Sequence, residues 1–475
     1  MGGEVRRDME RLLAGLGFLL VLILGGLVFA QPDVGGHWEG VIGPDSLNLG
    51  IRVDFEVTGG LSGTIDIPAQ GAAGLLLDVR FFEGSELTFA IAGIPGDPTF
   101  SGTLVGSRIE GTFTQAGRSF PFFLTREAVE APGLERPQEP KPPFPYRQEE
   151  VSYAGGGVTL AGTLTLPRGD GPFPALLLVT GSGAQNRNEE IVGHKPFLVI
   201  SDHLTRAGYA VLRMDDRGVG GSSGELGQAN YDDLVADILA GIAFLEGRGD
   251  IDGGRLGLLG HSEGGYLAPL AASRSRDVAF VIMLAGPSVP GIEVLKVQND
   301  VLLRLAGASD EQMSQQQDYL DALYRDLRDE DYDAATTLVR ERIGQQLAAL
   351  PEEQRPDAQG REALMAAQVA AAVSPVFRAF ITYDPRPALQ RLEVPVLAIY
   401  GQQDVQVPPV QSVGPLRAAL RRAGNEDVTI RVFPQLNHLM QTATTGAIEE
   451  YGTITETISP QVLDTITSWL QERFQ

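Results

Sequence analysis

Short stretches of alternating apolar and polar residues dominate the first quarter of the chain. Residues Val53 to Val57 alternate apolar and acidic side chains, the period expected of a half-buried β-strand. Similar stretches, separated by glycine-containing turns, are Leu61–Ile67, Leu87–Ala92, Ile109–Phe113 and Phe120–Leu124. Residues 36–126 are therefore predicted to form a small all-β domain, a barrel or sandwich of about seven or eight strands. Within it, we interpret His37 and Trp38 as a packed pair of aromatic rings.

A proline-rich segment follows at residues 127–147. Its six prolines cannot sustain a helix or a central strand, so an extended, semi-rigid linker is predicted. We place the domain boundary here.

From residue 148 the pattern changes to uniformly apolar runs between helical patterns. Ala175–Thr180 is a continuous apolar run ending in Thr180, as buried parallel strands require, and Tyr231–Glu246 has helical spacing. Further predicted strands are Val158–Leu166, Tyr209–Met214, Arg255–Gly260, Val278–Leu284, Val394–Tyr400 and Val428–Phe433. Strands that alternate with helices predict an α/β fold with a doubly wound, mostly parallel sheet over residues 148–475.

One long insertion interrupts this alternation. Residues from about 292 to 388 are rich in Ala, Gln, Leu, Asp and Arg, with few strand formers, and are predicted to form several helices. They follow a sheet strand at the edge where loops meet substrate. We therefore interpret the insertion as a helical cap over an active site rather than as additional packing.

The first thirty residues have the pattern of a targeting segment. Arg6, Arg7 and Arg11 precede an uncharged run, Leu12–Ala30, that ends in Val28-Phe29-Ala30. This order is typical of a secretory signal peptide, and the run is also long enough for an N-terminal membrane anchor. We expect export to the periplasm or the extracellular space, with membrane anchoring as the alternative.

Charge and composition exclude several classes of function. The formal net charge of −24 argues against nucleic-acid partners and against binding to an anionic membrane surface. The chain has no cysteine, which excludes thiolate metal sites and a cysteine nucleophile. Its five histidines are scattered without metal-ligand spacing, so a histidine-rich zinc site is not expected and no metal ligand is assigned, with calcium bound by carboxylates as the alternative left open.

A G-x-S-x-G motif supplies the candidate nucleophile, Ser262. The motif, Gly260-His261-Ser262-Glu263-Gly264, follows a predicted strand and precedes a run compatible with a helix. Glycines are needed because larger side chains at Gly260 and Gly264 would collide with the neighbouring strand and helix.

A serine nucleophile needs a base and an acid that orients the base. His438 follows the last predicted strand and is the only histidine after Ser262. Asp404 follows the strand before that one, while Asp427 is a weaker alternative because it precedes its strand. The order Ser262, Asp404, His438 is typical of this kind of triad.

Two backbone amides are candidates for stabilising the oxyanion. One belongs to Glu263, the residue after the nucleophile, and the other to Ser182, in the loop after Ala175–Thr180. The neighbouring run Asp215-Asp216-Arg217 is interpreted as a structural ion-pair and turn network. Arg187 is a weaker candidate for contacting a substrate carboxylate.

Taken together, residues from about 148 to 475 resemble an α/β-hydrolase of the bacterial esterase group related to dienelactone hydrolases and to the catalytic domains of prolyl-oligopeptidase-like enzymes. Five ordered segments carry the resemblance: Thr180–Gly183 with Asn186–Glu189, Asp215–Gly220, Gly260–Gly265, Gly401–Asp404 and Asn437-His438. The resemblance implies carboxylesterase activity without a cofactor.

The sequence therefore predicts a serine hydrolase that cleaves small carboxylic esters through an acyl-enzyme intermediate. A serine peptidase or thioesterase would use the same residues. Relatives that are peptidases carry a β-propeller, and residues 36–126 are too few and lack a blade-length repeat. A non-catalytic cell-envelope binding protein on the same scaffold is the alternative from another class, although it would need neither Ser262, Asp404 nor His438.

Overall fold

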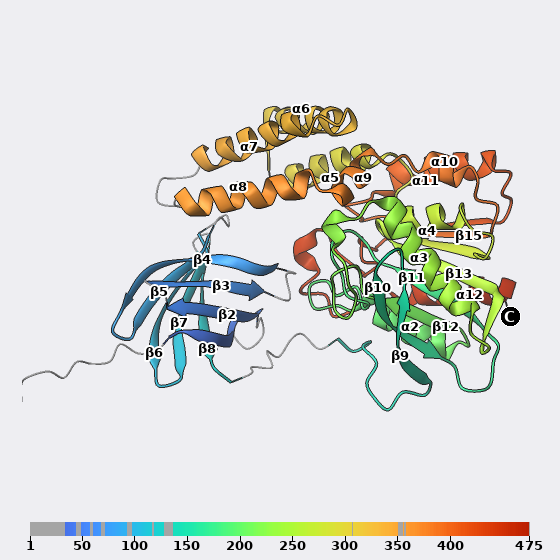
Figure 1. Cartoon of the computed structure of the whole chain (residues 1–475), viewed down its shortest axis with the longest axis horizontal. Coiled ribbons are helices and arrows are strands. Elements are labelled where there is room, and N and C mark those ends of the chain that lie inside the picture. Colours follow the sequence, from blue (N-terminus) through green and yellow to red (C-terminus); the bar gives the residue numbers. More distant parts are fainter. Residues whose placement is uncertain are drawn as a thin grey trace, which may run out of the picture. The chain divides into compact units, whose positions relative to one another are not determined.

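The chain falls into two compact units (Figure 1). The structure is a computed structural model. It describes residues 34–43, 49–57, 60–67, 72–92, 97–115, 118–127, 136–305, 307–349, 355 and 358–474. The predicted signal peptide or anchor at residues 1–30 lies outside the described residues.

The first unit is a closed barrel of eight strands in sequence order. Its strands are β1 (Gly36–Ile42), β2 (Leu49–Val57), β3 (Leu61–Ile67), β4 (Ala72–Glu83), β5 (Glu86–Ile91), β6 (Thr99–Val105), β7 (Arg108–Gln115) and β8 (Arg118–Thr125). β1 pairs antiparallel with β8, which closes the barrel. Aromatic side chains fill its interior, with Phe89 stacked on Phe100 at a ring-centroid distance of 4.7 Å. The predicted all-β domain is confirmed as a barrel.

The predicted pairing of His37 with Trp38 is wrong. Trp38 is buried, and its ring N–H donates to the carbonyl oxygen of Val34 at 2.8 Å. His37 is exposed, with its Nδ1 2.8 Å from Oδ1 of Asp54. Neighbouring residues of a strand point to opposite faces, so two consecutive rings on β1 do not pack on each other.

The second unit contains a sheet of eight strands in the order β16-β15-β14-β13-β11-β12-β10-β9. These strands are β9 (Arg147–Ala154), β10 (Thr159–Leu166), β11 (Phe173–Val179), β12 (Ala210–Met214), β13 (Ile251–His261), β14 (Phe280–Leu284), β15 (Val396–Gly401) and β16 (Val428–Phe433). Strands β11 to β16 are parallel, whereas β10 pairs antiparallel with β9 and β12. The predicted mostly parallel sheet is confirmed. Its first strand, β9, begins at Arg147, the last residue of the predicted linker.

Helices cover both faces of this sheet, as its apolar strands require. They are α2 (Pro196–Arg206), α3 (Tyr231–Glu246), α4 (Gly264–Ala272), α10 (Arg386–Leu389), α11 (Pro409–Arg422) and α12 (Pro460–Phe474). Along β11, Ala175 and Leu177 point into the core with α3, α4, α10 and α11, whereas Leu176 and Leu178 point into the core with α2 and α12. This alternation explains why the strand reads as continuously apolar.

The insertion after β14 is helical, as predicted. Its helices are α5 (Gly291–Leu305), α6 (Asp310–Arg328), α7 (Tyr332–Ala349), α8 (Ala358–Ala372) and α9 (Pro375–Thr382). Leu320 and Leu327 of α6 and Val339 and Ile343 of α7 bury themselves in a separate apolar core. Within the described residues no single helix has the length and hydropathy to cross a membrane, although the pair 360–372 and 375–382, bent by 49°, meets those criteria jointly.

The last part of the proline-rich segment is fixed to the second unit. The Gln138 side chain donates to the carbonyl oxygen of Ile458 at 2.7 Å and accepts from the amide of Thr457 at 2.6 Å. The Arg136 guanidinium donates to the carbonyl oxygen of Val192 at 3.2 Å. Residues 136–146 therefore belong structurally to the second unit.

Candidate active site

Ser262 lies in a sharp turn between β13 and α4. Its φ of +53° is the left-handed region that a residue with a β-carbon rarely adopts. The turn is held by two backbone bonds, from the Ser262 amide to the Leu284 carbonyl at 2.9 Å and from the Gly265 amide to the Ser262 carbonyl at 2.8 Å. Strain held in this way is typical of a nucleophile presented at the end of a strand.

The two motif glycines are required by the packing of this turn. A β-carbon at Gly260 would lie 2.0 Å from the carbonyl oxygen of Gly264, and one at Gly264 would lie 2.2 Å from that of Val179. Both contacts are with backbone atoms, which cannot move without shifting β11 or α4. The crowding inferred from the sequence is therefore present.

Asp404 and His438 come together at the same edge of the sheet. Nδ1 of His438 lies 2.9 Å from Oδ2 of Asp404, and both side chains are buried. The other carboxylate oxygen of Asp404 accepts from the amides of Gln406 and Val407, each at 2.8 Å. This turn fixes the carboxylate toward the imidazole.

Asp427, the weaker alternative, lies elsewhere. It immediately precedes β16, and its carboxylate pairs with Arg473 of α12 at 2.6 Å. Because the acid that faces His438 follows β15, the structure brings Asp404 and not Asp427 to the histidine.

Two amides near Ser262 are free to bind an oxyanion. In the described part of the chain, the backbone amides of Ser182 and Glu263 donate to no acceptor. The amide of Gly181, by contrast, donates to Oε1 of Glu189 at 2.8 Å. The amides of Ser182 and Glu263, the two residues predicted from the sequence as oxyanion donors, therefore have no competing acceptor among the described residues.

Ser262, His438, Ser182 and Glu263 line one cavity of about 530 Å³. Among the described residues, no hydrogen bond joins the Ser262 hydroxyl to the His438 ring, and both side chains line the same cavity. Most of the remaining wall is apolar: Ile191, Val192, Leu226, Pro287, Val294, Leu295, Val376, Phe377, Phe380, Val407, Leu439, Ile448 and Tyr451. Since these include residues of α5 and α9, the helical insertion forms part of the cavity wall. The volume is within the range of small-molecule sites.

The cavity wall has no lysine or arginine among the residues described. Glu263 is its one carboxylate, and the hydroxyl of Tyr231 donates to Oε1 of Glu263 at 2.8 Å. Burial of this carboxylate raises the pKa of Glu263. Arg187, proposed above to contact a substrate carboxylate, instead bonds both oxygens of Asp215, with Nη2 2.6 Å from Oδ2. That interpretation of Arg187 is wrong, because the guanidinium is already engaged.

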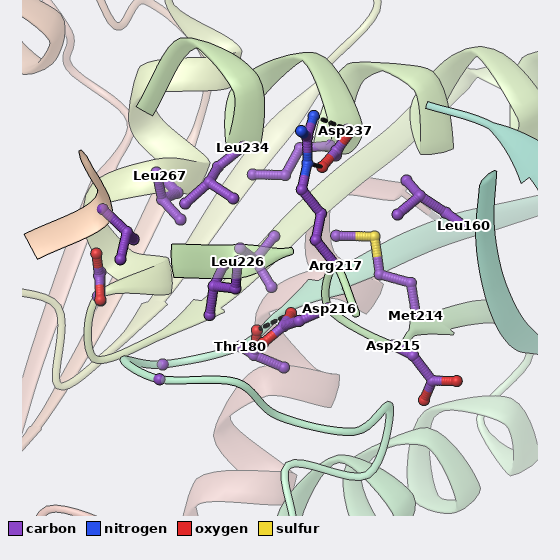
Figure 2. Close-up of a pocket in the computed structure, with 16 residues that line it drawn as sticks. Leu160, Thr180, Met214, Asp215, Asp216, Arg217, Leu226, Leu234, Asp237 and Leu267 are labelled. Carbon is purple, nitrogen blue, oxygen red and sulfur yellow. Dashed lines mark hydrogen bonds and ion pairs between the residues drawn. The ribbon is translucent and has the colours of Figure 1, made fainter. Parts of the chain in front are cut away.

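A second, smaller cavity of about 40 Å³ is lined in part by Thr180 and Asp216 (Figure 2). Asp216 borders it and accepts from the Thr180 hydroxyl and from the Gln185 amide, each at 2.8 Å. Desolvation of this carboxylate raises the pKa of Asp216 to about 7. Asp216 therefore holds the loop after β11 at both Thr180 and Gln185.

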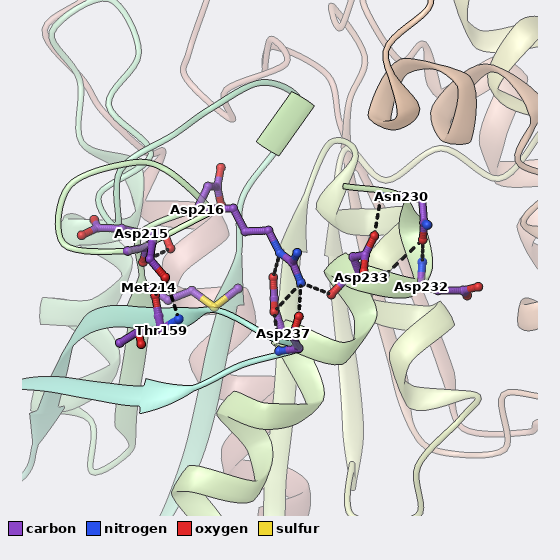
Figure 3. Close-up of polar contacts among 12 residues, drawn as sticks. Thr159, Met214, Asp215, Asp216, Asn230, Asp232, Asp233 and Asp237 are labelled. Atoms are coloured by element: carbon purple, nitrogen blue, oxygen red, sulfur yellow. Dashed lines mark hydrogen bonds and ion pairs between the residues drawn. The ribbon is translucent and has the colours of Figure 1, made fainter. Parts of the chain in front are cut away.

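Arg217 forms a buried ion pair with Asp237 of α3, its Nη2 lying 3.0 Å from Oδ1 (Figure 2). Asp237 is positioned by a helix that starts in a capping box, in which the Asn230 side chain accepts from the amide of Asp233 (Figure 3). The contacts of Asp215, Asp216 and Arg217 agree with their interpretation as a structural network.

Sequence reasoning missed two buried residues behind the site, Glu189 and His261. Nδ1 of His261 lies 2.9 Å from Oε1 of Glu189, and Nε2 of His261 lies 3.0 Å from the carbonyl oxygen of His438. The available signal was their place in the motifs, since Glu189 ends Asn186–Glu189 and His261 precedes Ser262. Nothing in the sequence pattern indicates that the two side chains meet.

Comparison with known families identifies two partial matches. A family model described as serine aminopeptidase, S33, matches residues 196–349, and one described as the prolyl oligopeptidase family matches residues 362–462. Each match covers less than half of the chain.

Three individual proteins are similar to the chain. Esterase EstD of Thermotoga maritima is 28% identical over 298 residues, which are 63% of this chain and 61% of EstD, so the chain spans less than two thirds of that relative's length. The structure of an esterase of Pyrococcus furiosus aligns with 74% of this chain and 100% of its own, at 15% identity and a TM-score of 0.42. That of a dienelactone hydrolase of Anabaena variabilis aligns with 69% and 99%, at 15% identity and a TM-score of 0.37.

Proposed function

We propose that this chain, whose second unit is an α/β-hydrolase domain, is a serine hydrolase that cleaves carboxylic esters. The observation that carries the proposal is the convergence of three features at one cavity. They are a strained serine, a histidine bonded to a buried carboxylate and two free amides. Nucleophile, base and oxyanion donors are the groups that acyl transfer requires.

The first half of the reaction acylates Ser262. Because Nδ1 of His438 faces Asp404, its Nε2 is the nitrogen that accepts the serine proton as Oγ attacks the ester carbonyl. Asp404 holds the imidazole in this tautomer and stabilises its positive charge. The C–O bond to the alcohol then breaks, and the alcohol leaves with the proton from His438.

The second half releases the acid. A water molecule gives its proton to His438 and attacks the acyl carbon, after which the Ser262 oxygen leaves and regains the proton. In both halves the negative charge of the tetrahedral intermediate falls on the carbonyl oxygen, beside the amides of Ser182 and Glu263. Removal of one such donor costs about 100- to 1000-fold in turnover in other enzymes.

The cavity favours esters whose acyl and alcohol parts are uncharged. Apolar side chains supply most of its wall, and Glu263 carries the one carboxylate among the described wall residues. Among the described residues of the wall, a substrate carboxylate would meet no lysine or arginine, and the buried His261 is already paired with Glu189, so the desolvation of the substrate carboxylate would remain uncompensated. Esters of neutral aliphatic acids are therefore the proposed substrate class.

The test is hydrolysis of nitrophenyl esters from acetate to long-chain acids, comparing residues 31–475 with the Ser262→Ala variant. Turnover by the parent, with loss in the variant at unchanged circular dichroism, would support the proposal. A parent inactive on every ester, or an equally active variant, would overturn it. A hemisuccinate ester of the preferred length should react at least about tenfold more slowly than the neutral ester.

A serine aminopeptidase is the second candidate, because both matching family models are named for peptidases. It would use the same three residues, with Glu263 as the carboxylate available for a substrate ammonium group. Aminoacyl nitroanilides and the corresponding nitrophenyl esters discriminate the two. Cleavage of the anilides that Glu263→Gln abolishes, while ester turnover is kept, would favour the peptidase, and turnover of the esters alone would favour the esterase.

For location, we propose export directed by residues 1–30. The arginines at positions 6, 7 and 11 before the apolar run support this proposal. Determination of the N-terminal residue of the protein recovered from the producing cell tests it. A start near Gln31 in a soluble fraction would support cleavage, and a membrane-bound chain with residues 1–30 intact would support the anchor.

A further inference from the structure

We infer that the buried pair Glu189–His261 positions two loops relative to the turn of Ser262. These are the loop after β11 that carries Ser182, called the oxyanion loop below, and the loop after β16 that carries His438. The inference rests on the proposed function, because it assigns a role within that site. Neither residue is part of the reaction steps described above.

Three loops meet at these two side chains. Oε1 of Glu189 accepts from the amide of Gly181, immediately before Ser182, at 2.8 Å. The same oxygen lies 2.9 Å from Nδ1 of His261, which precedes Ser262 in the turn. Nε2 of His261 lies 3.0 Å from the backbone carbonyl oxygen of His438. One continuous set of hydrogen bonds thus runs from the oxyanion loop to the loop of the base.

These bonds are satisfied together when both nitrogens of His261 carry a proton. A carbonyl oxygen only accepts, so Nε2 of His261 must donate to His438. Oε1 of an ionised Glu189 accepts one hydrogen bond from the Gly181 amide and a second from the Nδ1–H group of His261. The pair is then an imidazolium beside a carboxylate, and a neutral residue at position 189 would leave the histidine with one proton for two bonds.

Burial makes the pair rigid. Glu189 is 0% and His261 is 4% exposed. The other carboxylate oxygen of Glu189 has no partner among the described residues, and Glu189 has a φ of +53°. A strained backbone and an unpaired buried oxygen both cost free energy. The bonds of Oε1 to the Gly181 amide and to His261 offset that cost. Loss of the tie is expected to misplace the Ser182 amide and the His438 ring while leaving the apolar wall intact.

The decisive measurement is the rate at which Ser262 reacts with an alkyl fluorophosphonate. In this reaction the serine oxygen forms a bond to phosphorus, fluoride leaves with the P–F electrons, and His438 takes the serine proton. Oxyanion donors and base are both used, but no substrate need be identified. Glu189→Gln should react about 10- to 100-fold more slowly than the parent, the effect of a misplacement of about 1 Å.

Glu190→Gln is the matched control, since the neighbouring carboxylate is exposed and, among the described residues, takes part only in a 3.4 Å contact with Asn186. It should react at the parent rate. On the preferred ester, Glu189→Gln should lose the same factor in kcat per titrated active site, with KM unchanged within about threefold. A purely structural role would reduce the number of titratable sites and the Tm but leave kcat per site unchanged, and that result would overturn the inference.

If Glu189→Gln does not fold, two further variants test the two hydrogen bonds of His261 separately. His261→Asn keeps a donor near the position of Nδ1 but loses the bond to His438, and His261→Gln keeps a donor near the position of Nε2 but loses the bond to Glu189. Each should slow phosphonylation, and parent rates in both would refute the tie. Failure of the parent to react at all would instead refute the proposed function.

Discussion

Two backbone amides decide how the carboxylate of Asp404 faces its histidine. Gln406 and Val407 hold Oδ1, which leaves Oδ2 for Nδ1 of His438. At the scale of the residue, the two oxygens of one carboxylate thus bind different partners. Asp216 likewise uses one oxygen for Thr180 and the other for Gln185.

Replacement of Asp404 by Asn should therefore abolish most turnover without unfolding the protein. The amide can accept from Gln406 and Val407, but its donor side would present the wrong hydrogen-bonding group to His438. A loss of about 1000- to 10000-fold in kcat is expected, as for the corresponding change in other triads. The control is Asp427→Asn, whose carboxylate pairs with Arg473 away from the site and whose kcat should stay at the parent level. A larger loss in Asp427→Asn than in Asp404→Asn would contradict the assignment.

Asp216 should make stability fall as the pH rises toward neutrality. Its pKa is raised to about 7 by desolvation, whereas the unfolded value is about 3.9, so between these values the native state binds more protons than the unfolded state. The free energy of unfolding then decreases with increasing pH over that window and becomes independent of this group above it. Asp216→Asn should consequently gain about 2 kcal/mol relative to the parent between about pH 5.5 and about pH 8 in urea unfolding. A constant or opposite difference would show that Asp216 is ionised throughout.

At the scale of the element, the parallel strands determine where the chemistry lies. Ser182, Ser262, Asp404 and His438 each follow a strand of the sheet at its carboxyl edge, which is why chain order alone predicted their convergence. The strand runs were predictable because burial on both faces leaves a continuous apolar signal. The partners of the two Asp404 oxygens and the bonds of Glu189 were not predictable from the sequence, because they depend on loop geometry that no residue pattern encodes.

The error at His37 has a similar origin. Aromatic residues adjacent in sequence were interpreted as a packed pair, but the period of two on β1 places Trp38 inside and His37 outside. Alternation was therefore the better guide than residue type. The same alternation correctly identified the barrel strands around Val53–Val57.

Helix α9 should control the acyl length that the cavity accepts. Phe377 lies on this helix and lines the cavity, so Phe377→Ala enlarges the space beside Ser262. We expect the preferred acyl chain to lengthen by about two or more carbons, judged from kcat/KM across nitrophenyl esters, with some loss of Tm because a partly buried ring is removed. Tyr332→Ala on α7 is the control, since it removes an aromatic ring that does not line the cavity. An identical change of chain-length preference in both variants would argue against the role of α9.

At the scale of the whole molecule, all residues that line the candidate site lie between positions 181 and 451. The second unit also has its own cores on both sheet faces. The sequence predicted a domain start at residue 148, but Arg136 and Gln138 bond to the loops near residues 192 and 458. Such bonds between distant segments cannot be read from proline content.

A fragment of residues 136–475 should accordingly fold and hydrolyse esters at the rate of the longer chain. A fragment of residues 148–475 should melt several degrees lower, because the amide of Thr457 and the carbonyl of Ile458 lose their partner. Differential scanning calorimetry of the two fragments compares them directly. Equal melting temperatures would show that residues 136–147 do not contribute to the stability of the domain.

The most direct test of the central claim is mass spectrometry of the protein quenched in acid during turnover of a nitrophenyl ester. The account predicts an added mass equal to one acyl group, located by peptide mapping at Ser262 and absent in Ser262→Ala. Ester turnover with no adduct on Ser262, or with the acyl group on another residue, would contradict it.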